Sequence, residues 1–312
     1  ITNDFYTGTS YAHLESVHPA QTLVIPVSNL THLAPIGFAN STVQWNVQFT
    51  QPITTGQIPA PSYYSNVSFY FEPSANISRT NDTHMLTVVE GSVDQMIFQQ
   101  PEYYFDWASL ASTTVAGQGF PYELFLDERF TNDTSEYSYV RNVTFGIIND
   151  AGATDAYTTA LALEDFITNG NATTEFKRNY NGSGTSSPVD VTLNVLEALK
   201  EGSCREFNTA FVTMARLAGL PARQVTGYVG GTWTGDGYAV YSTDATTWSE
   251  VRLQQNSANG NTDLGWIPFD PCPPAEEVEI VNQTISTMTL ARDGTETVTV
   301  SGQLRYVANG TP

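Results

Sequence analysis

The spacing of apolar residues changes near residue 152, and this change limits which folds the chain can adopt. Upstream, short apolar runs such as residues 22–28 and 84–91 alternate with turn residues, a pattern typical of a β-sandwich. Downstream, residues 154–167 and 189–199 carry apolar side chains at helical spacing, and strand-like runs follow them. The sequence therefore predicts an α+β fold whose first part is rich in β-strands.

This pattern predicts four regions. We expect residues 1–110 to form a β-sandwich-like domain and residues 111–150, which contain clustered aromatic side chains, to connect it to the next domain and pack on it. Residues 151–275 combine helices and strands in one domain. Residues 276–312 return to β character, and they either pair with the preceding domains or donate a strand as the start of a further β module.

The charge balance excludes several classes of partner. Asp and Glu outnumber Lys and Arg 32 to 12, which gives a net charge of -20. Such a surface repels phosphate backbones and anionic membranes, so we expect no nucleic-acid partner. The sequence contains no apolar run long enough to cross a membrane. Divalent cations suit this charge better, and calcium binding stays open although the sequence contains no loop with calcium-binding spacing. We assign no metal ligands and expect no cofactor.

Two features predict a secreted protein at the cell surface or outside the cell. The chain starts at Ile1 and not at Met, which favours removal of a leader peptide. Sequons of the form Asn-x-Ser/Thr are dense, although a chain rich in Asn and Thr also makes some of them by chance. The candidates for covalent glycans are Asn29, Asn40, Asn66, Asn76, Asn81, Asn132, Asn142, Asn171, Asn181, Asn282 and Asn309.

The stretch 201–228, EGSCREFNTAFVTMARLAGLPARQVTGY, places a cysteine at the start of a predicted helix. Ser203 and Glu206 have the spacing of a capping box, and Gly219 and Pro221 end the helix. A thiolate at Cys204 would be stabilised by the helix dipole, and the free N–H groups nearby could bind an oxyanion. Such a nucleophile needs a base and an orienting carboxylate, which the strands that follow could supply.

These residues carry a family resemblance. Gly-x-Cys, Ala-Arg-x-x-Gly-x-Pro-Ala-Arg, Val-x-Gly-Tyr and Gly-Trp-x-x-Phe-Asp-Pro stand in the order and spacing of the transglutaminase-like superfamily. The chain resembles the papain-like core of that family, in its secreted prokaryotic branch, over residues 150–275. The resemblance implies that Cys204 is the nucleophile and Asp270 the orienting carboxylate. Thr246 stands where the family has its general-base histidine, between Asp244-Ala245 and Trp248.

The missing histidine implies that the catalytic residues are vestigial. A threonine hydroxyl cannot accept a proton near neutral pH as an imidazole does. The four histidines of the chain lie in the N-terminal β region, outside the segment that builds the site, at positions His13, His18, His32 and His84. An active site would therefore have to import its base from another domain.

Cys272 is a second departure, because the family usually has threonine there. If Asp270 points toward the base position beside Cys204, then Cys272 at the end of the same strand is within disulfide reach of Cys204. Because an exterior location favours disulfides, we expect Cys204 and Cys272 to be joined. The bond would consume the nucleophile.

Other charged residues of the motifs have structural interpretations. We expect Arg216 and Arg223 each to pair with a carboxylate. The acidic residues Glu164, Asp165 and Glu206 are interpreted as solvated faces or caps.

Three hypotheses for function remain open. The first is a catalytically inactive transglutaminase-like protein with a structural role, a glycosylated surface or filament subunit that self-assembles through β-strand contacts. The second is an active cysteine peptidase, amidase or protein-crosslinking acyltransferase that uses Cys204. The third is a carbohydrate- or partner-binding module that uses aromatic residues such as Trp233 and Tyr238.

Overall fold

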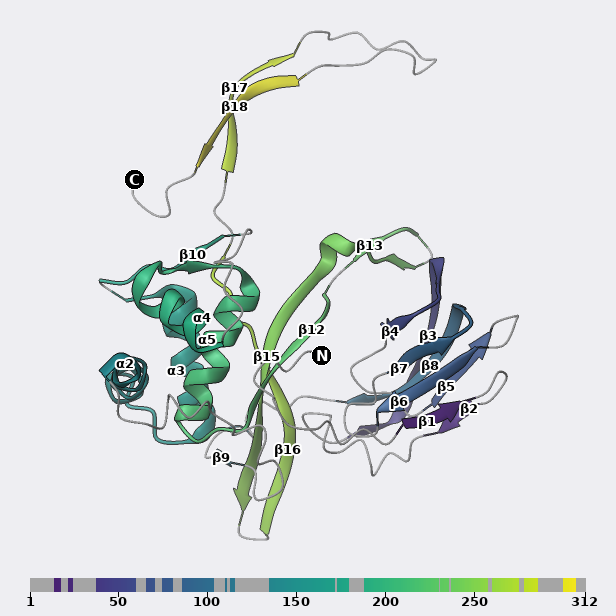
Figure 1. Cartoon of the computed structure of the whole chain (residues 1–312), viewed down its shortest axis with the longest axis horizontal. Coiled ribbons are helices and arrows are strands. Elements are labelled where there is room, and N and C mark those ends of the chain that lie inside the picture. Colours follow the sequence, from purple (N-terminus) through teal and green to yellow (C-terminus); the bar gives the residue numbers. More distant parts are fainter. Residues whose placement is uncertain are drawn as a thin grey trace.

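The protein is a mixed α+β chain with antiparallel sheets at its N-terminal end, helices packed on a further sheet, and a C-terminal hairpin (Figure 1). The computed structural model describes residues 14–17, 22–24, 38–59, 66–70, 75–80, 86–103, 110, 113–115, 135–171, 173–179, 188–229, 231–235, 237–257, 260–274, 278–285 and 300–306.

The N-terminal region contains two four-stranded sheets in which every pair is antiparallel. The first has the order β1 (Leu14–Val17), β6 (Asn76–Thr80), β7 (Leu86–Glu90) and β4 (Gly56–Ile58). The second has the order β2 (Thr22–Val24), β5 (Asn66–Tyr70), β8 (Val93–Tyr103) and β3 (Phe38–Ile53).

Both sheets bury alternate side chains. Leu86 and Val88 are buried on β7, and Met96 and Phe98 are buried on β8, whereas the residue between each pair is more exposed. Since successive side chains of a strand point to opposite faces, each sheet turns one apolar face inward. This alternation agrees with the period-two pattern of the sequence.

Four helices build the α part of the next region. They are α2 (Ser135–Asp150), α3 (Ala156–Asn169), α4 (Pro188–Leu193), which continues as the π-helical segment Asn194–Ala198, and α5 (Cys204–Leu217). Helix α2 lies within residues 111–150, for which the sequence predicts a connecting segment and no helix. Val140 of α2 belongs to the same apolar core as α3 and α5, so this helix is part of the packing of the domain.

These helices pack on a sheet with the order β12 (Ala222–Tyr228), β15 (Ala245–Ser257) and β16 (Gly260–Phe269). β9 (Thr113–Val115) also pairs with β15. In Figure 1 the helices lie on one side of this sheet and the N-terminal sheets on the other. Short pairs complete the domain: β10 (Lys177–Arg178) with β11 (Glu201–Gly202), and β13 (Thr232–Trp233) with β14 (Tyr238–Ala239).

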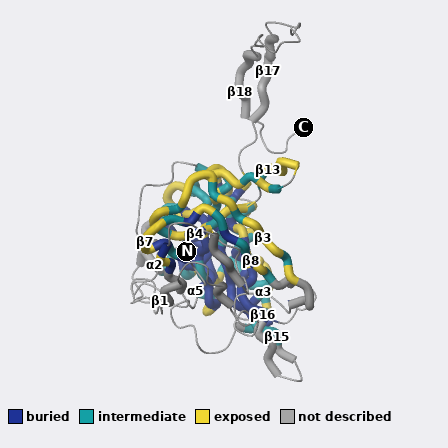
Figure 2. Tube along the Cα trace, turned by 90° about the vertical axis from the view of Figure 1, so that its right-hand side faces the viewer, coloured by how far each residue is buried: buried dark blue, intermediate teal, exposed yellow. Residues whose placement is uncertain are grey.

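Helix α5 is the centre of the core. Phe207, Phe211 and Met214 are fully buried on it, and Figure 2 shows the helix in the buried interior. It packs against α3, α4 and β15, and Phe211 stacks on Phe269 of β16 with ring centroids 5.6 Å apart. Because α5 is enclosed by helices and sheet, its first residue is held in a fixed place relative to both.

Helix α5 begins at Cys204, directly after the N-cap residue that the sequence predicts. Ser203 is the N-cap residue, and its backbone N–H and hydroxyl donate to Oε2 of Glu206 at 2.7 and 3.0 Å. Glu206 is a buried cap, as its spacing from Ser203 indicates. Gly219, with a φ of 82°, follows the end of the helix. These caps determine where Cys204 sits.

The C-terminal strands β17 (Val278–Ile285) and β18 (Val300–Tyr306) form an antiparallel hairpin of their own. In Figure 1 this hairpin stands apart from the helices and from the other sheets. Its strands pair with each other and with no other described strand.

Candidate functional site

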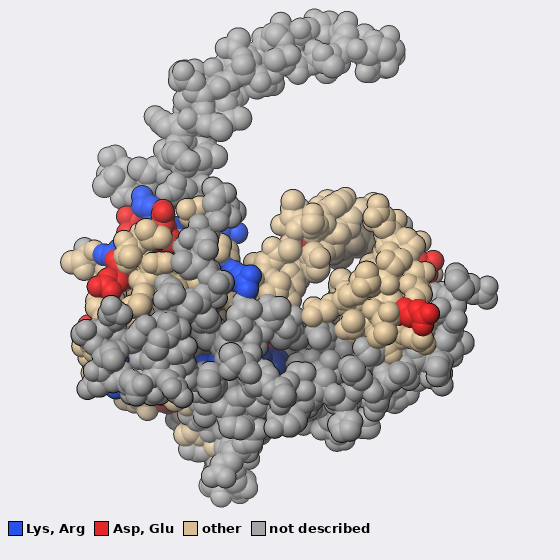
Figure 3. All heavy atoms as spheres, viewed as in Figure 1, with Lys and Arg blue, Asp and Glu red and all other residues tan. Residues whose placement is uncertain are grey.

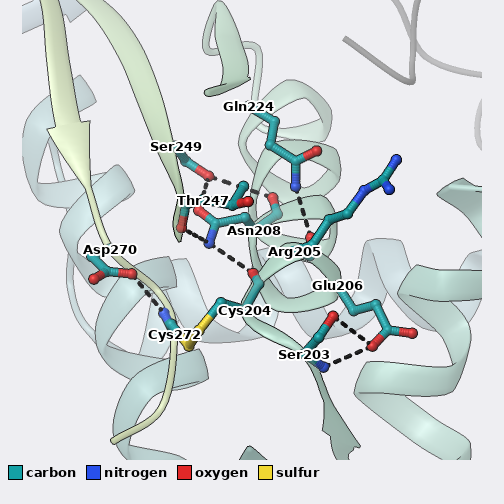
Figure 4. Close-up of a disulfide and its surroundings, with 10 residues drawn as sticks. All are labelled: Ser203, Cys204, Arg205, Glu206, Asn208, Gln224, Thr247, Ser249, Asp270 and Cys272. Carbon is teal, nitrogen blue, oxygen red and sulfur yellow. Dashed lines mark hydrogen bonds between the residues drawn. A yellow bond between two sulfur atoms is a disulfide. The ribbon is translucent and has the colours of Figure 1, made fainter. Parts of the chain in front are cut away.

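Cys204 and Cys272 form a disulfide, as the sequence predicts (Figure 4). Cys204 is the first residue of α5, and Cys272 lies three residues beyond the end of β16. Their Cα atoms are 4.9 Å apart, and the bond closes a loop with a sequence separation of 68. The sulfur at the nucleophile position is therefore bonded to another sulfur and does not carry a free thiol.

Asp270 lies at the position of the family's orienting carboxylate, and its contacts hold the disulfide loop. Its Oδ1 accepts a hydrogen bond from the backbone N–H of Cys272 at 3.2 Å. Its own backbone N–H donates to Oε1 of Glu164 at 2.6 Å. The Asp270 carboxylate thus bonds to the backbone N–H of Cys272. The family resemblance would instead place this carboxylate next to a histidine.

Thr246 is the second residue of β15, opposite Gly227 of β12 in the register of the sheet. It lines a cavity of about 590 Å³ together with Asp270, Trp248 and Arg178. Because Thr246 and Asp270 share one cavity, the structure brings the predicted base position and the predicted carboxylate together. The cavity offers a hydroxyl where acyl-transfer chemistry needs an imidazole.

Glu164 of α3 is a contact of this site that the sequence analysis missed. The sequence interprets Glu164 as part of a solvated face or as a cap; its carboxylate is partly buried and accepts a hydrogen bond from the backbone N–H of Asp270. Burial raises the pKa of Glu164, and the negative charges of Asp270 and Asp165 raise it further, whereas the hydrogen bond from Asp270 opposes this shift. Glu164 stands four residues after the buried Ala160, so the two lie on one face of α3. This spacing is the feature of the sequence that indicates burial of Glu164.

Asn208 links the start of α5 to β15, and the sequence did not single it out. Its Nδ2 donates to the carbonyl of Cys204 at 2.8 Å and to that of Thr247 at 2.9 Å. Its Oδ1 accepts from the hydroxyl of Ser249 at 2.6 Å. Asn208 and Ser249 are completely buried, so these bonds form without competition from water.

The two arginines of the motif have different partners. Arg223 forms an ion pair with Glu250 at 2.6 Å and lies over the ring of Trp266, 4.1 Å from its centroid. The carboxylate predicted for Arg223 is therefore present. Arg216 donates from Nε and Nη2 to the carbonyl of Ala222 at 2.9 and 2.7 Å, which fastens the end of α5 to the start of β12.

An exposed aromatic surface lies next to the cavity. Trp233 and Tyr238 pair across the β13–β14 hairpin with ring centroids 5.1 Å apart, and they are 59% and 66% exposed. Tyr241 and Val229 nearby are also exposed, and Val229 lines the cavity. In the view of Figure 3 the described surface consists mostly of uncharged residues. Apolar side chains gathered in this way mark a candidate binding surface.

Several predicted residues fall outside what the structure describes. This holds for all four histidines and for the sequons at Asn29, Asn81, Asn132, Asn181 and Asn309. Asn40, Asn66 and Asn282 lie on strands, and their side chains are not described. Asn76, Asn142 and Asn171 have described and exposed side chains.

Two absences hold for the part of the chain that the structure describes. This part of the chain contains no group of three or more His, Cys, Asp or Glu side chains placed to hold a metal ion. None of its helices is long and apolar enough to cross a membrane.

Comparisons with known proteins agree with this geometry. Residues 142–271 match the transglutaminase-like superfamily. The chain is 30% identical over 116 residues to the uncharacterized protein YebA of Bacillus subtilis (strain 168); this match covers 35% of the chain and spans only 14% of the length of YebA.

Solved structures share the fold. The periplasmic domain of TgpA from Pseudomonas aeruginosa superposes with a TM-score of 0.51 at 15% sequence identity, over 84% of this chain and 82% of that one. The same domain bound to ethylmercury gives a TM-score of 0.47 at 14% identity, with 84% of each chain covered. The match to the family model shows that residues 142–271 form a transglutaminase-like superfamily domain, and the fold shared with the TgpA domain at a TM-score of 0.51 agrees with it.

Proposed function

We propose that this protein is a catalytically inactive transglutaminase-like protein with a structural role outside the cytoplasm. The observation that carries the proposal is the disulfide between Cys204 and Cys272, which occupies the nucleophile position. The hydroxyl of Thr246 at the base position supports it, because no imidazole is present there to activate a thiol.

The chemistry of acyl transfer explains why this arrangement favours inactivity. The reaction requires a thiolate that attacks a carbonyl carbon, and a base that takes the thiol proton. The sulfur of Cys204 is held in a covalent bond, and reduction would restore the thiol but not the base. Removing the members of such a triad costs several orders of magnitude in rate.

The same disulfide supports a location at the cell surface or in another oxidising compartment. Disulfides persist outside the cytoplasm, where reducing systems do not keep thiols free. The fold shared with a periplasmic domain agrees with this location. The eleven sequons support a glycoprotein, with covalent glycans as the modification.

Self-assembly is the structural role that the β regions support best. The hairpin of β17 and β18 pairs with no other described strand, and each of its edges could accept or donate a strand. The buried faces of the two N-terminal sheets favour a β-sandwich at the other end of the chain. Head-to-tail contacts between different surfaces give open filaments.

We expect removal of residues 278–312 to abolish oligomers in analytical ultracentrifugation, and oligomers of unchanged size would contradict the assembly proposal.

The inactivity proposal is tested with a matched pair of proteins. We expect the wild type to show neither peptide hydrolysis nor incorporation of a fluorescent primary amine into a glutamine-rich acceptor, before or after reduction. The variant Thr246→His with Cys272→Thr restores the family's residues and serves as the positive control, since its Cys204 should react faster with iodoacetamide at neutral pH. Turnover by the reduced wild type that is lost in Cys204→Ala would overturn the proposal.

A second candidate function is binding through the exposed aromatic surface. Trp233, Tyr238 and Tyr241 expose their rings, and exposed aromatic side chains bind sugars and peptides through their flat apolar faces. A glycan array with the wild type and Trp233→Ala tests this candidate. Binding that disappears in Trp233→Ala but persists in Trp45→Ala, which replaces an exposed tryptophan of β3, would support it, and an array without signal would count against it.

A further inference from the structure

Three sequons have described side chains, and they present their two essential groups very differently. An N-glycan is attached to the asparagine carboxamide, and the Ser or Thr two positions later must also be accessible to the transferase. The structure therefore allows the sequons at Asn142 and Asn171 to be judged by the exposure and bonding of both residues, and the sequon at Asn76 by its asparagine and its strand.

The sequon at Asn142 lies within the 16-residue helix α2. Asn142 is exposed, but Thr144 is completely buried. The hydroxyl of Thr144 donates to the carbonyl of Val140 at 2.8 Å, within the same helix. A transferase that acts on the folded chain cannot reach this hydroxyl without unwinding α2.

The sequon at Asn76 lies at the start of strand β6, which is paired on both sides by β1 and β7. The carboxamide nitrogen of Asn76 donates to Oε2 of Glu90 at 3.0 Å. The middle residue, Ile77, is only 1% exposed and belongs to the buried face of the sheet. The backbone of this sequon is therefore part of the sheet, and its asparagine side chain is hydrogen-bonded to the neighbouring strand.

The sequon at Asn171 lies in a tight turn after α3 and has the opposite properties. The backbone N–H of Asn171 donates to the carbonyl of Thr174 at 2.8 Å, and the N–H of Thr174 donates to the carbonyl of Asn171 at 3.2 Å. Asn171 and Thr173 are both exposed. The turn therefore presents both the asparagine and the threonine of the sequon at the surface.

Thr173 also orients the asparagine. Its backbone N–H and its hydroxyl donate to Oδ1 of Asn171 at 2.9 and 3.0 Å. With Oδ1 held in this way, the carboxamide nitrogen of Asn171 has no partner among the described residues. The carboxamide oxygen of Asn171 is therefore held by Thr173, and the carboxamide nitrogen, which would carry the sugar, bonds to no described residue.

We propose that Asn171 is N-glycosylated in the folded protein, and that Asn142 and Asn76 are not. In this step the carboxamide nitrogen of Asn171 attacks the anomeric carbon of a phosphate-activated glycosyl donor. The new carbon–nitrogen bond forms as the carbon–oxygen bond to the phosphate breaks. The phosphate leaves with the bonding electron pair, and the amide proton passes to a base of the transferase. The proposal does not depend on whether the transglutaminase-like domain is active.

Digestion of the protein from its natural source with a protease that cuts after glutamate tests the proposal. Cleavage after Glu136, Glu164 and Glu175 places Asn142 in the peptide 137–164 and Asn171 in the peptide 165–175. Mass spectrometry of intact glycopeptides should find a glycan on 165–175 in most copies, and 137–164 without one.

Three variants expressed in the same host extend the test. Asn171→Gln and Thr173→Val should each remove the glycan from 165–175, whereas Asn142→Gln should leave the glycan content of the protein unchanged. An unmodified 165–175 would overturn the proposal. A glycan on 137–164 would also overturn it, because this result would mean that the sugar is attached before α2 folds.

Discussion

The contact between α5 and β15 has an interior and a rim, and the two parts differ in chemistry. In the interior, Asn208 and Ser249 are completely buried, and their hydrogen bonds join the first turn of the helix to the strand. At the rim, Cys204 and Cys272 are partly exposed and covalently joined, and Thr246 faces a cavity.

This difference separates the residues that position the site from those that would perform chemistry. The interior network holds the start of α5 against β15 whatever the side chain at position 246. The buried contacts of Asn208 are made with the backbone of Cys204 and of Thr247 and with the hydroxyl of Ser249, so they do not involve the side chains at positions 204 and 246. Under the proposed inactivity, the fold keeps the position of the site without its catalytic groups.

The largest effect should come from the rim disulfide. Reduction, or the double variant Cys204→Ser with Cys272→Ser, removes a link across 68 residues and should lower the free energy of unfolding by about 4 kcal/mol. Urea denaturation with and without reductant measures this loss. The double variant should not respond to reductant. Equal stability of the oxidised and reduced wild type would mean that the rim does not hold the domain together.

The next largest effect should come from the interior. Asn208→Ala leaves the carbonyl of Thr247 and the hydroxyl of Ser249 without their buried partner, which should cost about 2 to 3 kcal/mol. The exposed Asn169→Ala, which removes a hydrogen bond to Asp165, should cost less than about 0.5 kcal/mol. Similar losses for the two variants in urea denaturation would remove the distinction between interior and surface.

A smaller loss is expected at the opposite face of the sheet. Arg223→Ala removes the ion pair with Glu250 and the contact with Trp266, and should cost about 1 kcal/mol. Arg223→Lys keeps the charge but loses the planar stacking, so its loss in thermal denaturation should be intermediate. If Arg223→Lys behaved as wild type, the ring of Trp266 would contribute nothing.

The smallest effect should be a change in pH dependence at Glu164. Its raised pKa means that the folded state holds the proton more tightly than the unfolded state, whose pKa is about 4.3. This contribution to stability is present below the unfolded pKa and is lost as the pH rises through the folded pKa. Glu164→Gln keeps an acceptor for the N–H of Asp270 without a charge.

The free energy of unfolding of Glu164→Gln should therefore fall less with rising pH than that of the wild type, and at neutral pH it should equal or exceed it. Urea denaturation across the acidic range measures both. Glu164→Ala, which removes the acceptor, should be less stable than Glu164→Gln at every pH. A steeper fall for Glu164→Gln would contradict the burial of this carboxylate.

The sequence predicts the rim better than the interior. Cys204, Asp270 and Cys272 belong to motifs with fixed spacing, so their meeting and their disulfide could be predicted. The capping box of Ser203 and Glu206 is a local pattern, and it correctly places the start of α5.

The residues that were missed depend on contacts between distant segments. Asn208 bonds to strand residues 39 and 41 positions away, and Glu164 meets Asp270 across 106 positions. Nothing in the spacing of polar residues along one helix shows which strand faces it. Helix α2 was missed because the aromatic and polar residues of 111–150 hide the helical pattern of residues 135–150, which packs through Val140.

The most direct test of the central claim is a non-reducing peptide map of the natural protein. Trypsin cuts after Lys200, Arg205, Arg252 and Arg292, so Cys204 lies in the peptide 201–205 and Cys272 in the peptide 253–292. A structural disulfide predicts that the two peptides are recovered as one linked species that separates on reduction. Recovery of 201–205 alone, alkylated at Cys204 by iodoacetamide without prior reduction, would contradict the account and favour the enzyme hypothesis.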